Sequence, residues 1–179
     1  MTDRPSLEVE FARAEVRVSW GHAQRLLAAG VPATALWRPT LVGVLDGTLV
    51  VPAGWADWEE DAPGWAEIRD MVQIDPEKPE TWQPVYGTCP VLGLEQVEHA
   101  VVYGHALQLH RHPLDWIRAR GSGACIIDWS CDPRRWIGQA PAITCATPGL
   151  ARQLQNRMEE CARWHRPRIT VAQSWRAAA

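Results

Sequence analysis

The sequence predicts an α/β protein: a small parallel sheet with flanking helices, preceded by a small α+β lobe that contains a β-hairpin. In the second half, short apolar runs alternate with helical segments, an order typical of a parallel sheet covered by helices. In the first half, Asp46-Gly47 stands between two runs rich in β-branched residues, which is a strong hairpin signal. The 179 residues suffice for one domain or two small lobes. We expect the small lobe over residues 1–92, the parallel-sheet lobe over residues 93–172 and a tail over residues 173–179.

The first half carries local signals for a helix, a hairpin and a further strand. Ser19 caps a predicted helix that Gly30 and Pro32 end. The remaining expectations, in chain order, are a short strand or lead-in over residues 9–18, the hairpin over residues 40–53, an acidic loop over residues 54–66, a third strand over residues 68–74 and an irregular crossing over residues 77–90.

The second half has a different pattern, in which Pro113 and Pro148 each open a helix. Thr147 caps the second of these helices, and its apolar residues fall on one stripe. In chain order we expect an apolar run over residues 97–103, a strand over 107–110, a helix from 113 to 118, a buried strand over 124–128, a turn or short helix over 132–136, a strand over 142–145, a helix from 148 to about 164 and a last strand over 168–172.

Charge is divided unevenly between the two halves. The net charge is −3, but residues 1–99 carry −9 and residues 100–179 carry +6. This asymmetry predicts either a polyanionic partner for the basic half or two halves that neutralise each other. All basic residues except Lys78 are arginine. A GC-rich genome or bidentate recognition of phosphate or carboxylate would each produce that preference.

Arginine and tryptophan recur together in the basic half, a pattern that suits phosphate contact combined with base stacking. The alternative is a solvated basic face. The candidate nucleic-acid-binding residues are Arg134, Arg135, Trp136, Arg152, Arg163, Trp164, Arg166 and Arg168. In the acidic half, Trp55, Trp58 and Trp65 are candidates for exposed anchors of a protein partner.

The stretch from Leu107 to Trp129 resembles the opening of a Toprim domain, the catalytic domain of DnaG-type and phage-type primases and of topoisomerases. Pro113 and Asp115 match the Pro-x-Asp of the family's Glu-Gly-Pro-x-Asp signature, and a helix, a glycine turn and a second strand follow. The stretch from Ile143 to Val171 is similar to the family's strand, Asp-x-Asp-x-x-Gly loop, helix and strand, with Gly149 at the glycine. The first half loosely resembles the small lobe before Toprim in phage-type primases, and the chain is similar to proteins of prophage regions.

The chain departs from the Toprim pattern at the acidic positions. Arg111 and His112 stand where the family has its glutamate and glycine, and Thr144 and Ala146 stand where it has two aspartates. Toprim chemistry needs the glutamate for general acid/base work and the aspartates to hold Mg²⁺. The resemblance therefore implies a relative that is metal-free and catalytically inactive, and that still binds nucleic acid or a replication protein.

Other chemistries have weaker patterns. His105, His110 and His112 with Asp115 suggest zinc ligands, but neither helical nor strand spacing places all three imidazoles on one face, so we expect no metal site. Asp115, Asp128 and His110 define a hydrolase alternative. Nucleotide-phosphate and nucleophile-elbow motifs do not occur, so we expect no small-molecule cofactor.

The expected function is a non-catalytic, Toprim-like protein of the cytoplasm that binds nucleic acid or a replication protein through its basic half. The compartment follows from five cysteines without a Cys-x-x-Cys pair and from the lack of an export signal in the sequence. The sequence has no apolar run of membrane-spanning length, so we expect no membrane partner. The alternative is a protein-interaction module that uses the acidic, tryptophan-rich stretch.

Overall fold

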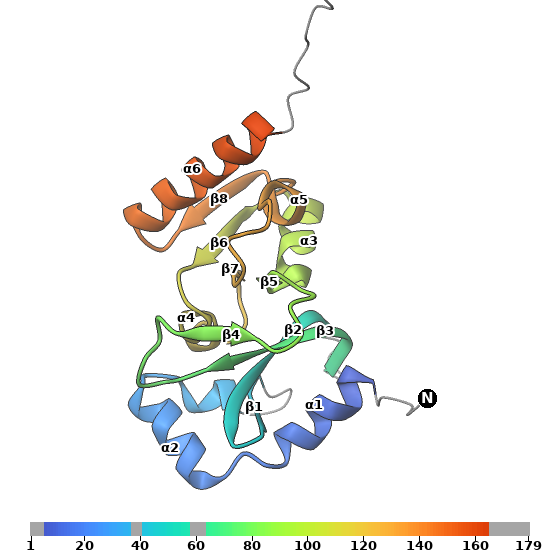
Figure 1. The fold of residues 1–179 in the computed structure, drawn as a ribbon, viewed down its shortest axis with the longest axis vertical. Coiled ribbons are helices and arrows are strands. Elements are labelled where there is room, and N and C mark those ends of the chain that lie inside the picture. Colours follow the sequence, from blue (N-terminus) through green and yellow to red (C-terminus); the bar gives the residue numbers. More distant parts are fainter. Residues whose placement is uncertain (1–5, 37–40, 58–63, 165–179) are drawn as a thin grey trace, which may run out of the picture.

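The computed structural model has a mixed α/β fold with two four-stranded sheets, and Figure 1 shows the first sheet below the second. The structure describes residues 6–36, 41–57 and 64–164. At residues 55–57, 64–66 and 163–164 it describes the backbone alone. The first sheet is antiparallel in the order β1-β2-β3-β4, and the second is mixed in the order β5-β7-β6-β8. No helix in the described ranges has the length and apolar character needed to cross a membrane.

Among the described residues, three helices are followed by five strands, and helices and strands alternate from α3 onward. The helices are α1 (Leu7–Glu15), α2 (Trp20–Ala28), the 3₁₀ helix η1 (Ala33–Leu36), α3 (Leu94–Tyr103), α4 (Pro113–Arg118), α5 (Arg134–Ile137) and α6 (Pro148–Trp164). The strands are β1 (Gly43–Leu45), β2 (Thr48–Asp57), β3 (Gly64–Ile74), β4 (Trp82–Pro84), β5 (Val91–Leu92), β6 (Ala106–His110), β7 (Ala124–Ile126) and β8 (Ala142–Cys145).

The predicted start of the chain was partly wrong. Helix α1 replaces the strand or lead-in expected over residues 9–18, because Phe11 and Ala14, three residues apart, lie on one helical face and are buried. The helix at Ser19 is confirmed as α2. The Ser19 hydroxyl accepts a hydrogen bond from the His22 backbone N–H, and His22 Nδ1 accepts one from the Ser19 N–H, so the two residues form a capping box.

The hairpin at Asp46-Gly47 is confirmed. Strands β1 and β2 pair up to Leu45 and Thr48, and the two turn residues have φ values of 48° and 78°. A two-residue hairpin turn with both φ values positive matches the right-handed twist of the strands. Glycine at the second position adopts this conformation without a steric penalty. The turn residues therefore set the register of β1 against β2.

The stretch expected as an acidic loop over residues 54–66 begins and ends in strands. Strand β2 continues to Asp57 and β3 begins at Gly64, and the two pair along this length with irregularities beside Gly54 and Trp55. A Cβ atom at Gly54 would lie 2.0 Å from the Glu67 carbonyl oxygen, so only glycine permits this close strand approach. Gly54, at the start of the expected loop, thus permits an irregular strand.

The crossing between the sheets is also more ordered than predicted. Residues 77–90 include β4, which pairs with β3 from Val72 to Ile74. The apolar run over residues 97–103 lies in α3, with Val97 and Ala100 buried. The strand expected over residues 168–172 lies outside the described residues.

The second sheet has parallel pairing at its centre, as expected. Strand β6 pairs in parallel with β7 on one side and with β8 on the other. Strand β5 adds an antiparallel edge beside β7, so the sheet is mixed. Helices α4, α5 and α6 occupy the predicted places.

One hydrophobic cluster joins the two sheets. It contains Val51 and Val72 of the first sheet together with Leu109 and Cys125 of the second, all at 0% exposure. Trp116 of α4 is also fully buried, and its indole Nε1–H donates to the Gly123 carbonyl at 2.9 Å. The halves that the sequence distinguishes therefore share one core.

A buried carboxylate fixes the segment that leads from the first sheet to the second. Asp70 of β3 is 0% exposed. Its Oδ1 accepts from the N–H groups of Met71 and Tyr86 at 2.7 and 2.9 Å. Its Oδ2 accepts from those of Thr88 and Cys89 at 2.8 and 3.4 Å. Four backbone donors are thus satisfied by one side chain at the point where the chain crosses between sheets.

Replacing Asp70 by asparagine should lower the free energy of unfolding by about 3 kcal/mol, because an amide NH₂ would face two backbone donors and leave them unpaired inside the protein. Urea denaturation measures the change. The matched control is Glu67→Gln on the same strand, where an exposed ion pair with Arg69 is lost. This control should cost less than about 1 kcal/mol. Equal effects of the two substitutions would contradict the role of Asp70.

Candidate functional site

The carboxyl ends of the parallel strands form the candidate site. Strand β6 lies between β7, the next strand along the chain, and β8. Ligands in α/β proteins bind at such a point, where the connections from neighbouring strands diverge. Leu109 is in register with Cys145, and the Ala146 N–H donates to the Leu109 carbonyl at 3.0 Å. The ends of β6 and β8 are therefore adjacent.

This edge brings together the positions that the Toprim resemblance singled out. Arg111 follows β6 directly and is exposed, while Thr144 and Ala146, also exposed, lie on and just after β8. An arginine, a hydroxyl and a methyl group offer no carboxylate oxygen for Mg²⁺, which prefers oxygen ligands. The chemistry at these three positions suits an anion better than a divalent cation.

His112, the residue before α4, packs toward the first sheet. Its ring lies edge-on to Trp82 of β4, with 5.6 Å between ring centroids. The Trp82 Nε1–H in turn donates to the Ile127 carbonyl at 3.0 Å, just after β7. Burial lowers the pKa of His112, and the nearby guanidinium of Arg111 acts in the same direction, against Asp115. The neutral form of His112 is therefore favoured, and its ring packs against Trp82.

The three residues of the hydrolase alternative each have a separate partner. Asp115 pairs with Arg118 at 2.7 Å. The His110 ring contacts the Ser122 carbonyl at 2.9 Å. Asp128 accepts from the Ser130 N–H and hydroxyl at 2.8 and 2.6 Å and from the Cys131 thiol at 3.1 Å. Each of the three side chains thus has a local structural contact. The hydrolase alternative stays a prediction.

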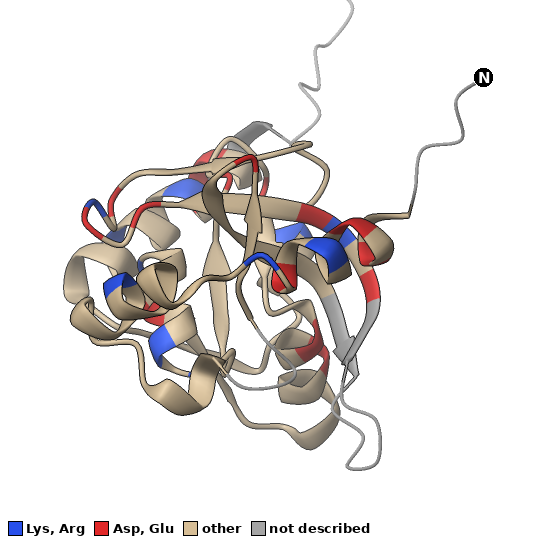
Figure 2. Ribbon diagram, turned by 90° about the horizontal axis from the view of Figure 1, so that it is seen from below, with Lys and Arg blue, Asp and Glu red and all other residues tan. Residues whose placement is uncertain are grey.

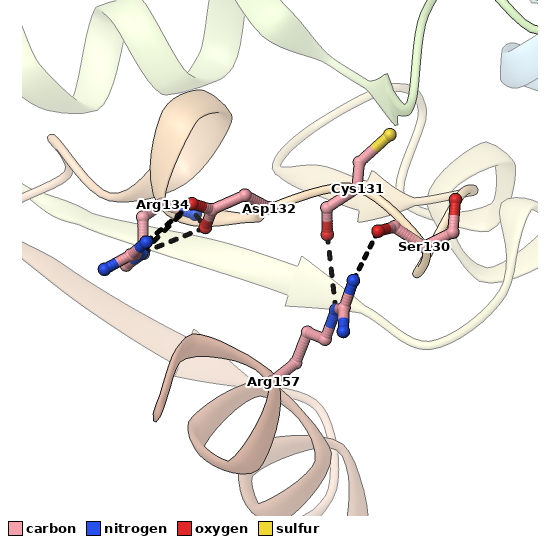
Figure 3. Close-up of polar contacts among 5 residues, drawn as sticks. All are labelled: Ser130, Cys131, Asp132, Arg134 and Arg157. Atoms are coloured by element: carbon pink, nitrogen blue, oxygen red, sulfur yellow. Dashed lines mark hydrogen bonds and ion pairs between the residues drawn. The ribbon is translucent and has the colours of Figure 1, made fainter. Parts of the chain in front are cut away.

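The loop after β7 is fastened to α6 by an arginine. Arg157 of α6 donates to the backbone carbonyls of Ser130 and Cys131, as Figure 3 shows, and also pairs with Glu160 at 3.2 Å. In the same loop Asp132 faces Arg134, with 2.7 Å between Oδ2 and Nη2. The sequence predicted a turn or short helix from residue 132 and gave no sign that Arg157 has a structural role.

The predicted basic face is only partly described. Arg134 is paired with Asp132, and Trp136 is half-buried and packs against the core. Arg135 and Arg152 are exposed. The side chains of Arg163 and Trp164, and the whole of Arg166 and Arg168, lie outside the described residues. In Figure 2 the basic positions are spread over several helices and loops with acidic positions beside them.

The tryptophans proposed as protein anchors fall at the far end of the β2–β3 hairpin. Trp55 is in register with Glu67, and Trp65 with Ala56. Their side chains, and the whole of Trp58, lie outside the described part of the chain. The placement of Trp55 and Trp65 in strands corrects the expectation of a loop, and their role as anchors stays a prediction.

The histidines are arranged differently from any set considered in the sequence. His105 lies beside His99 of α3, with 5.0 Å between ring centroids, and is not gathered with His110 and His112. Within the described ranges, no three His, Cys, Asp or Glu side chains form a group that could hold a metal ion. His99 was missed because it is six residues away, and only the glycine turn between the two makes them neighbours.

Two further features bear on chemistry. An apolar groove of about 670 Å³ lies between α5, β8 and α6, lined by Ile143, Cys145, Leu154 and Met158, with Gln155 and Glu159 at its polar margin. Its lining suits contact with an apolar surface. Cys125 on β7 is fully buried, and burial raises the pKa of its thiol. A cysteine nucleophile needs a thiolate, so Cys125 is unsuited to that role.

No family model, curated protein or solved structure matches the chain.

The hydrogen bonds that the Asp128 carboxylate accepts from Ser130 should make the stability of the protein depend on pH. Hydrogen bonds from Ser130 hold the pKa of Asp128 below its ordinary value of 3.8, so its contribution is fully present above pH 3.8 and is lost as pH falls through the lowered pKa. Unfolding free energies of the wild type and Asp128→Asn should therefore differ at neutral pH and converge in acid. Ser130→Ala should reduce this pH dependence. A difference that stays constant down to about pH 2 would contradict the prediction.

Proposed function

We propose that this chain is a non-catalytic, Toprim-like binding protein that contacts nucleic acid through its basic C-terminal half. One observation carries the proposal: the ends of β6 and β8 are adjacent, and the three Toprim-aligned positions there are Arg111, Thr144 and Ala146. The order of β6, α4, β7 and the later β8–α6 unit agrees with the layout of the resemblance. The proposal therefore combines the strand order expected from the resemblance with side chains that suit an anion.

The ligand chemistry follows from that change of charge. A guanidinium beside the strand ends would repel Mg²⁺ and attract a phosphate, with which arginine forms paired hydrogen bonds. Asp115 and Asp128, the acids that follow β6 and β7 in the chain, each have local partners. A phosphate of a nucleic-acid backbone is therefore the group best suited to Arg111. Arg152 on α6 adds a second exposed basic position in the same half.

If the protein is non-catalytic, the purified chain should show no Mg²⁺-dependent primer synthesis and should not nick supercoiled plasmid. The physical reason is the lack of carboxylates at the three aligned positions. Gel assays with Mg²⁺ and with Mn²⁺, each with and without EDTA, measure both activities. An EDTA-sensitive product that is lost in Arg111→Ala would overturn the assignment as non-catalytic.

If the protein binds nucleic acid through its basic half, single-stranded DNA should quench its intrinsic tryptophan fluorescence. Its affinity for the DNA should fall steeply as the salt concentration rises. Arg111→Ala should lower the affinity and reduce the slope of log affinity against log salt by about 0.7, as expected for one lost phosphate contact on a single strand. The control is Arg17→Ala, an exposed arginine of the N-terminal half. Equal slopes for the two variants would remove Arg111 from the interface.

A protein-interaction module is the second candidate, and the β2–β3 hairpin favours it. This hairpin extends through both sides of an acidic, tryptophan-rich segment, so that Trp55 and Trp65 are at nearby register positions. Aromatic residues of this kind anchor protein interfaces. A failure to bind DNA even at low salt would remove the first proposal and place this one in front.

A further inference from the structure

The end of α3 carries an imidazole pair on an exposed apolar surface. His99 and His105 are both exposed, and their ring centroids are 5.0 Å apart at an interplanar angle of 64°. The His99 ring also lies 4.3 Å from the Tyr103 ring. Contact with rings on two sides limits the orientations of His99. The pair is therefore partly ordered by its own surroundings.

Local backbone geometry creates this pair. Gly104 ends α3 in the left-handed conformation with φ of 69°, and its N–H donates to the Ala100 carbonyl. The His105 N–H also donates to the Ala100 carbonyl, at 3.2 Å. A left-handed glycine after a helix turns the chain back over the last turn. His105 consequently returns toward His99 although six residues separate them.

The spacing of the two rings suits two ligands of one metal ion. Zn²⁺ binds imidazole nitrogen at about 2.0–2.1 Å in tetrahedral geometry, so two histidine rings on one ion have centroids about 5 Å apart. The observed 5.0 Å agrees with this value. Two imidazoles fill only half of a tetrahedral shell. No third His, Cys, Asp or Glu of the described residues joins the pair, so the described part of one chain supplies only half of the ligands.

The surface around the pair has the character of an interface. Val101, Val102 and Tyr103 are 40%, 68% and 70% exposed, and they are consecutive in the last turn of α3. The other exposed large apolar side chains of the described ranges, Val9, Val16, Trp20 and Leu27, lie in or beside the two N-terminal helices. A cluster of exposed apolar side chains beside two exposed histidines suits a site of association. A twofold axis through the ion would bury these side chains against their own copies.

We propose that His99 and His105 form half of a zinc site, and that a second copy of this chain supplies the other two imidazoles. The bound ion joins two chains through the ends of their α3 helices. Val102 and Tyr103 surround the ion and exclude water from it. Association of the chain then depends on the supply of Zn²⁺, independently of nucleic-acid binding at the Arg111 edge.

The test uses the full chain, freed of metal with EDTA, kept reduced and titrated with zinc chloride. Sedimentation velocity should show a shift from 20.0 kDa to about twice that mass, and native mass spectrometry should find one zinc per two chains. His99→Ala and His105→Ala should each abolish the shift. Val102→Glu should weaken the dimer while leaving both histidines in place. The control is His22→Gln, which keeps a residue suited to the α2 capping box and should dimerise like the wild type.

Cobalt substitution separates this site from the cysteines. Co²⁺ held by four imidazoles lacks the near-ultraviolet charge-transfer band of a cobalt–thiolate bond, so the loaded dimer should show only the visible bands of tetrahedral cobalt. A thiolate band, a zinc-bound monomer, or dimerisation unchanged in both histidine variants would overturn the proposal. Circular dichroism of each variant confirms that a lost dimer is not a lost fold.

Discussion

The Asp70 carboxylate sets the geometry on which the rest of the molecule depends. It lies at full burial on β3 and takes four backbone N–H groups, three of them from the segment that leads to the second sheet. A backbone group left unpaired at this depth would cost about 1–3 kcal/mol. By satisfying them together, Asp70 fixes where β5 begins and hence how β5 pairs with β7. The shared core and the hydrogen bond from Trp82 to the Ile127 carbonyl then hold the second sheet against the first.

Much of the fold was predictable because its signals are local. Asp46-Gly47, Ser19, Pro113 and Pro148 each act through the backbone of their own neighbourhood, and each element that they predict is present. The errors arose where distant contacts decide the outcome. Strand β4 depends on its pairing with β3, and the extension of β2 depends on a strand that passes close to Gly54. Asp70 looked like an ordinary strand residue because its partners are up to nineteen positions away.

The candidate site was predictable in position but not in its contacts. The parallel order of β6, β7 and β8 places Arg111, Thr144 and Ala146 at one edge, as the alternation of strands and helices implied. No sequence pattern shows that Arg157 binds the carbonyls of Ser130 and Cys131, or that Arg118 donates to the Ala29 carbonyl at 2.9 Å. These arginines serve the fold by holding carbonyl groups across sequence separations of 26 to 89 residues. Part of the positive charge of the second half is thus used within the chain.

Cys89 and Cys125 are buried, so the rate at which each thiol is alkylated measures how often its surroundings open. Burial raises the pKa of the Cys89 thiol to about 11 and raises that of Cys125 as well, so neither reacts from the closed state. Each thiol becomes available to an alkylating reagent only when its surroundings open. The Cys89 backbone N–H donates to the Asp70 carboxylate, and Cys125 lies on β7 of the second sheet. Their two labelling rates therefore report whether the crossing segment and the second sheet open together or separately.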